Sequence, residues 1–175
     1  HKPELNESRF QEEHTSLSSI DMALELAAAK ANSLTRNFPT ALVIGADQTL
    51  EFNGKTQHKA NSMSEARRQL ELMAGQMHLL HSAVACANSS GLLFRHVATA
   101  RLTMRAFSKA FLDGYLLSMG ERVLHTVGGY EFEAQGIQLF EKIDIDIRRG
   151  KHKLRQRQQP RLIAPPYTFQ RNKTS

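Results

Sequence analysis

The sequence predicts a single α/β domain in which helices pack in layers against a sheet. Apolar runs typical of strands alternate along the chain with segments of helical periodicity. Of the 175 residues, 41% are apolar, which is enough to form one hydrophobic core. We expect the domain to cover residues 1–147, and residues 148–175 to form a basic, disordered tail with little periodicity.

Three helices are predicted from composition, apolar spacing and capping residues. Residues 19–35 are rich in helix formers and place apolar side chains on one face. Ser62 and Glu65 form a capping box that opens a second helix, and Gly75 marks its end. Ser108 begins a third amphipathic helix.

The strands are predicted from short apolar or alternating runs. "ALVIGA", residues 41–46, is continuously apolar, which is typical of a strand covered on both faces. The pair Asn53-Gly54 predicts a turn between two short extended segments. Residues 78–87 and 92–106 flank the polar turn "NSSG" and predict a long antiparallel hairpin, and "GIQLFEKID" predicts a last strand.

The positive charge of the chain is concentrated at one end. The formal net charge is +6, but residues 148–175 hold nine Lys and Arg and no acid. The rest of the chain is slightly acidic, so only the tail is expected to bind nucleic acid, and then without sequence preference. A single cysteine, Cys86, and no long apolar segment predict a cytoplasmic protein that does not bind membranes.

Asp47 is the first candidate for chemistry, because a carboxylate directly follows the apolar run "ALVIGA". Ligands of open α/β sheets bind at the carboxyl ends of strands, where this sequence places Asp47. The alternative is that Asp47 only caps the following turn. Several other charged or polar residues accompany it in the sequence: Gln48, Lys59, Lys30, Glu7 and Glu133.

The order of several motifs resembles the Maf family of nucleoside triphosphate pyrophosphatases. The resemblance covers about residues 4–146 and includes "LAAAKA", "LVIGADQTL", "GKTQHKA", "ARLTMRAFS" and "VGGYEFEAQGIQLFEKID". It implies an elongated mixed sheet with flanking helices and a nucleotide cleft, similar to the fold of inosine triphosphate pyrophosphatases. It also implies a hydrolase that cuts a nucleoside triphosphate into a monophosphate and pyrophosphate.

The resemblance assigns roles to four charged residues. Asp47 aligns with the proton acceptor of the family, and Lys59 and Lys30 align with lysines that bind phosphate oxygens. Asp47 and Glu7 would hold a divalent metal, Mg²⁺ or Mn²⁺, whose charge makes a triphosphate accessible to water. Alternatively, Glu7 is a solvated carboxylate near the terminus, and Lys30 extends along a helix surface into solvent.

Two positions bear on the choice of nucleotide. Gln48 follows Asp47, and Glu133 lies before the last strand, in a pattern similar to the 7-methyl-GTP branch of the family. Glu133 would complement the positive charge of a methylated guanine, and Gln48 offers both a donor and an acceptor to a base edge. The alternative for Glu133 is a loop acid that faces water.

Two family segments have no counterpart here: an N-terminal Ser- and Arg-rich phosphate loop and a C-terminal "GLP" segment. Ala60 also replaces the proline of the family's "KP" motif. These departures leave a second hypothesis open, in which the chain is a non-catalytic, truncated remnant that binds nucleotides or forms a homodimer.

Overall fold

The computed structural model describes residues 5–132 and 134–146. Its centre is a five-stranded sheet with the order β2-β1-β3-β4-β5. The strands are β1 Val43–Phe52, β2 Lys55–Gln57, β3 Met77–Asn88, β4 Gly91–Met104 and β5 Phe140–Asp146. A mixed sheet was expected, and the four pairings among these strands are all antiparallel. The basic tail predicted for residues 148–175 lies outside the described residues.

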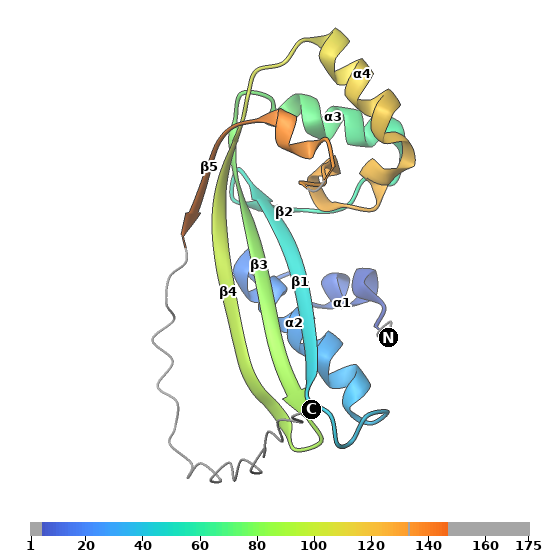
Figure 1. The fold of residues 1–175 in the computed structure, drawn as a ribbon, viewed down its shortest axis with the longest axis vertical. Helices are drawn as coiled ribbons and strands as arrows, with labels where there is room; N and C mark the ends of the chain where they lie inside the picture. Colours follow the sequence, from blue (N-terminus) through green and yellow to red (C-terminus); the bar gives the residue numbers. More distant parts are fainter. Residues whose placement is uncertain (1–4, 133, 147–175) are drawn as a thin grey trace, which may run out of the picture.

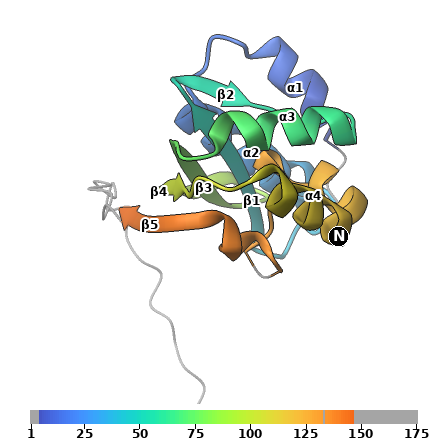
Figure 2. The same cartoon turned by 90° about the horizontal axis from the view of Figure 1, so that it is seen from above.

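The helices divide between one face of the sheet and one of its ends (Figure 1). They are α1 Glu7–Glu13, α2 Ser19–Thr35, α3 Met63–Met73 and α4 Lys109–Met119, followed by the 3₁₀ helices η1 Gly120–Leu124, η2 Val127–Gly129 and η3 Gly136–Leu139. Helix α2 covers one face of the long strands, whereas α3 and α4 gather at the end of the sheet, as the view from above also shows (Figure 2). No helix in the described part of the chain is long and apolar enough to cross a membrane.

The structure confirms the α/β class and the predicted helix signals. Ser62 Oγ accepts a hydrogen bond from the backbone N–H of Glu65, and Ser108 Oγ accepts one from Phe111. Asn53 and Gly54 both have positive φ, as the tight turn between β1 and β2 requires. Helix α1 and the three 3₁₀ helices were not predicted.

Two predictions about the first strand were wrong. Strand β1 does not stop at Ala46 but continues to Phe52, so Asp47 lies in the middle of a strand and not at its carboxyl end. The strand is also not covered on both faces, since the side chain of Ile44 is 66% exposed while Val43 and Gly45 are buried against α2. A short apolar run cannot distinguish these cases, because one-sided cover only appears once α2 is placed.

Helix α2 lies unusually close to the sheet because the contact consists of small residues. Ala23, Ala27 and Ala31 are fully buried on α2, and they pack against Ala85 and Ala87 of β3. Gly45 of β1 sits directly under the helix backbone. A Cβ atom at this position would clash with the carbonyl oxygen of Ala27 and lie 2.6 Å from the backbone nitrogen of Ala31. The larger core, around Leu50, lies at the end of the sheet that carries α3 and α4.

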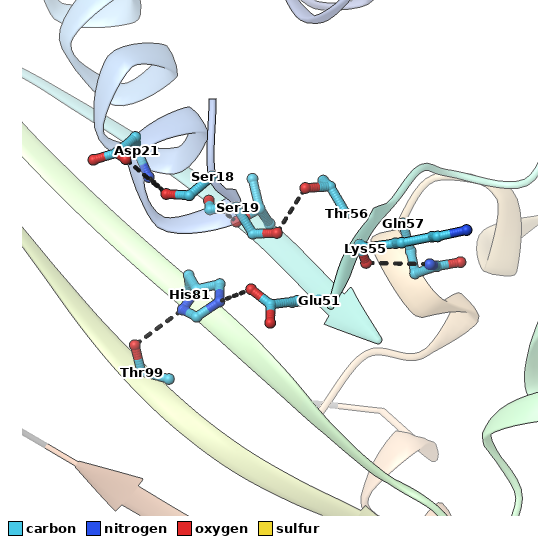
Figure 3. Close-up of polar contacts among 10 residues, drawn as sticks. Ser18, Ser19, Asp21, Glu51, Lys55, Thr56, Gln57, His81 and Thr99 are labelled. Atoms are coloured by element: carbon cyan, nitrogen blue, oxygen red, sulfur yellow. Dashed lines mark hydrogen bonds and ion pairs between the residues drawn. The ribbon is translucent and has the colours of Figure 1, made fainter. Parts of the chain in front are cut away.

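A buried polar network ties α2 to the first hairpin (Figure 3). Thr49 of β1 donates a hydrogen bond of 2.6 Å to the carbonyl oxygen of Ser19, and Ser19 Oγ lies 2.6 Å from Thr56 Oγ1 on β2. On the same face of the sheet, His81 contacts Thr99 Oγ1 at 2.9 Å, and its Nε2 lies 3.5 Å from Glu51. The hydrogen bonds of Ser19 thus join the start of α2 to both β1 and β2.

The close approach at Gly45 can be tested by adding a methyl group. Gly45→Ala should lower the free energy of unfolding by about 1–3 kcal/mol, because the helix backbone must move away from β1. Gly114→Ala is the matched control, since Gly114 lies within α4 and no atom lies within 4 Å of a Cβ built there. That control should be neutral or stabilising by up to about 1 kcal/mol. Urea unfolding of both variants measures the difference, and equal stabilities would contradict the proposed contact.

Candidate active site

A cleft with a volume of about 800 Å³ runs along β1, between α1 on one side and the loops before β5 on the other. Strand β2 pairs only with residues 50–52 of β1, so within the described residues the segment 43–49 pairs with β3 alone. The cleft follows this open edge of the sheet. Side chains from both faces of β1, such as those of Asp47 and Gln48, can therefore line the same cavity.

Four charged residues from separate elements meet at one end of the cleft. Lys30 Nζ, on α2, donates hydrogen bonds to Asp47 Oδ1 at 2.5 Å and forms an ion pair with Glu7 Oε1 at 2.7 Å. Lys59 Nζ, in the segment after β2, lies 3.9 Å from Glu7 Oε2. The structure thus brings together Glu7, Lys30, Asp47 and Lys59, which we call the charged cluster. Lys30 does not extend into solvent, and Asp47 does not cap a turn.

The residues of the charged cluster differ strongly in burial. The pKa values of the two most buried, Asp47 and Lys30, are shifted. The side chain of Asp47 is 8% exposed, whereas that of Lys59 is 55% exposed. Burial raises the pKa of the Asp47 carboxyl above its ordinary value, and the hydrogen bond and charge of Lys30 only partly offset this. Burial alone would lower the pKa of Lys30, but its bonds to Asp47 and Glu7 outweigh burial and raise it. Asp47 is therefore a stronger base than an exposed aspartate.

Gln48 lines the cleft from the other face of β1, and its Nε2 donates a hydrogen bond of 2.9 Å to Ser82 Oγ of β3. This bond uses one donor of the Gln48 amide and does not engage its side-chain oxygen. Glu133, the second predicted specificity residue, lies outside the described residues.

The far end of the cleft is aromatic and was missed by sequence reasoning. Tyr130 and Phe132 line it together with Val127, and the two aromatic rings meet edge to face with centroids 5.5 Å apart. Tyr130 is held from behind by a hydrogen bond of 2.9 Å to His78 Nε2, a histidine whose pKa burial lowers to about 4. The signal was present in "VGGY", where Gly128 and Gly129 adopt positive φ and turn the chain toward the cleft.

Comparison with known proteins identifies the family of the chain. The model of the family described as Maf-like protein matches residues 1–148. The chain belongs to the Maf family. Relatives include a 7-methyl-GTP pyrophosphatase of Rhizobium meliloti, 43% identical over 77% of this chain and 67% of its own length. One of Brucella suis biovar 1 is 46% identical over 72% of this chain and 63% of its own length.

A third Maf relative carries a broader name. The nucleoside triphosphate pyrophosphatase of Maricaulis maris is 41% identical over 83% of this chain and 74% of its own length. The chain thus spans about two thirds of the length of the curated relatives that it matches. Membership of the family is shown by these matches, whereas the substrate and the roles of single residues need separate arguments.

The donor set of the charged cluster fits a hard divalent cation. Asp47 and Glu7 each direct a carboxylate oxygen at the same cationic atom, Lys30 Nζ, so the space between them already accepts positive charge. Mg²⁺ is commonly bound by one or two carboxylates together with substrate phosphates. No group of three His, Cys, Asp or Glu residues suited to a metal occurs among the described residues, so a two-carboxylate site would need oxygen atoms from the substrate.

The balance between burial and Lys30 predicts how the Asp47 carboxyl titrates. Its pKa should lie above the ordinary value of 3.8, and Lys30→Gln should raise it further, because the stabilising cation is lost while burial remains. Lys55→Gln, on the exposed β2 strand, is the control and should leave the pKa unchanged. Titration of the Asp47 carboxyl carbon by NMR measures all three proteins. A lower pKa in Lys30→Gln would contradict the described contact.

Proposed function

We propose that the protein hydrolyses nucleoside triphosphates to a nucleoside monophosphate and pyrophosphate, as the names of its Maf relatives suggest. The observation that carries this proposal is the polarity of the cleft. Two lysines and two carboxylates meet at one place in the cleft, and the lining elsewhere includes Phe132 and the mostly buried ring of Tyr130. A nucleoside triphosphate has the same polarity, with anionic phosphates at one end and a stackable base at the other.

The charged cluster supports the roles assigned to Lys30 and Lys59. The cluster contains two cations and two anions, so its charges balance before a nucleotide binds. Phosphate oxygens compete with Asp47 and Glu7 for the two ammonium groups. When Lys30 turns toward phosphate, the Asp47 carboxylate is released from its ion pair and is open to a new partner. Substrate binding therefore prepares Asp47 to accept a proton from the attacking water.

Asp47 and Glu7 are also the residues that would hold a divalent cation, Mg²⁺ or Mn²⁺. When bound, such an ion neutralises phosphate charge and so lowers the repulsion that an approaching water meets. The protein's own contribution is to hold two carboxylates on opposite sides of one cation position, Glu7 on α1 and Asp47 on β1.

For the substrate, we propose 7-methyl-GTP, with Gln48 and Glu133 reading the base. Relatives that bear the name 7-methyl-GTP pyrophosphatase support this choice, and Gln48 lines the cleft with a side-chain oxygen that its bond to Ser82 does not engage. Methylation gives the guanine ring a positive charge, which a carboxylate such as Glu133 would attract.

The role of Asp47 predicts a large loss of turnover on a small change. Asp47→Asn keeps the size of the side chain but removes the proton acceptor, so pyrophosphate release should fall by at least about a hundredfold. Glu71→Gln, on α3 and outside the cleft lining, is the control for loss of one acid. Release is measured with an excess of Mg²⁺. Full Mg²⁺-dependent activity in Asp47→Asn would refute the assignment and favour a different base.

The choice of base predicts an order of substrates. The protein should release pyrophosphate fastest from 7-methyl-GTP, more slowly from GTP, and slowest from dTTP and UTP. Glu133→Gln should reduce the preference for 7-methyl-GTP over GTP by roughly tenfold, the effect of losing a hydrogen bond to a charged group. Fastest turnover of dTTP or UTP would overturn the methylguanine proposal and leave the pyrophosphatase proposal intact.

A further inference from the structure

The aromatic end of the cleft contains a carboxylate that the sequence analysis did not single out. Glu131 lies between Tyr130 and Phe132 in the chain and lines the cleft. Its Oε2 forms an ion pair with Arg122 Nη2 of η1. The side chain of Glu131 is 25% exposed, so it is partly removed from water, while Arg122 is more exposed.

The backbone around Glu131 is fixed by several hydrogen bonds. The carbonyl oxygen of Glu131 accepts hydrogen bonds from the N–H groups of Ala134 at 3.2 Å and Gly136 at 2.9 Å. A Cβ atom on Gly136 would lie 2.5 Å from that oxygen, so only glycine allows this turn. Tyr115 also donates a hydrogen bond of 2.9 Å to the carbonyl oxygen of Gly129. These hydrogen bonds hold the backbone on both sides of Glu131.

We propose that Glu131 is a specificity residue that selects a positively charged base, and that Arg122 competes with the base for its carboxylate. This proposal rests on the proposed function, because the charged cluster binds the phosphates and leaves the aromatic end for the base. A neutral base offers no positive charge to the Glu131 carboxylate, so the ion pair with Arg122 stays closed. A base with a positive ring, such as 7-methylguanine, shares or replaces Arg122 as the partner of the carboxylate.

The competition follows from the different burial of the two partners. Arg122 is mostly solvated, so little free energy is lost when its half-exposed ion pair opens. Glu131 is more deeply placed and keeps a cationic partner in either state, from Arg122 or from the ring. Opening the ion pair costs free energy, which a cationic base compensates by binding Glu131 and a neutral base does not.

Two substitutions of the same ion pair should shift the preference for 7-methyl-GTP over GTP in opposite directions. Glu131→Gln removes the attracting charge and should lower the ratio of the two kcat/KM values by roughly tenfold. Arg122→Gln removes the competitor and should raise the same ratio by about threefold, the range of an exposed ion pair. A purely structural ion pair would change both substrates equally in both variants. Glu121→Gln, next to Arg122 in η1, is the control for local charge.

A charge-swapped double variant and direct binding measurements separate the role of Glu131 from effects on folding and on turnover. The double variant Arg122→Glu with Glu131→Arg retains the ion pair but turns its cation toward the cleft, and it should lose the preference even if Glu131→Gln unfolds. Binding of 7-methyl-GTP and GTP analogues with an imido link between the α and β phosphates is measured by calorimetry. A preference in binding that depends on Glu131, without turnover, would refute the pyrophosphatase proposal and support this one. An unchanged ratio in Glu131→Gln, by turnover or by binding, would overturn the role of Glu131.

Discussion

The close contact between α2 and β1 at Gly45 is the constraint on which the candidate site depends. Because Gly45 has no side chain, the backbone of α2 at Ala27 and Ala31 rests directly on the strand. Lys30 lies between these two residues on the same helix, and Asp47 lies two residues after Gly45 on the same face of β1. The short distance between the two backbones lets a lysine and an aspartate meet beneath the helix, where both are shielded from water. A larger residue at Gly45 would move the helix away from the strand. This movement would also separate Lys30 from Asp47.

This packing also explains the electrostatics of the charged cluster. Asp47 is buried because α2 covers it, and burial is the largest contribution to its raised pKa. The network of Ser19, Thr49 and Thr56 fastens the start of the same helix to β1 and β2. The network thereby connects α2, which carries Lys30, with β2, the strand that precedes Lys59. Two lysines with different exposure thus face the same end of the cleft.

The sequence predicted the parts of the fold that local signals determine. The helix of residues 19–35, the cap at Ser62 and the turn at Asn53-Gly54 depend on neighbouring residues and are confirmed, although Glu65 accepts its reciprocal bond from the N–H of Asn61 and not of Ser62. The position of Asp47 within β1 could not be predicted, because pairing with β3 extends the strand past the carboxylate. The meeting of Lys30 and Asp47 depends on helix packing, and only the family resemblance placed them in one site. Glu131 gave no signal, since its partner Arg122 and its exposure to the cleft appear only in three dimensions.

Both ends of the cleft contain charged side chains that are already paired within the protein. At each end, opposite charges of the protein satisfy one another, in the charged cluster around Lys30 and in the ion pair of Glu131 with Arg122. A ligand gains from such a site only if it offers a better partner than the one already present, because opening the pair must be compensated. Under the proposed function, phosphates would meet this condition for the lysines, and a cationic ring would meet it for Glu131. On this proposal, a nucleotide that fits only one end would open only one pair, so the full cleft would favour ligands that carry negative charge at one end and positive charge at the other.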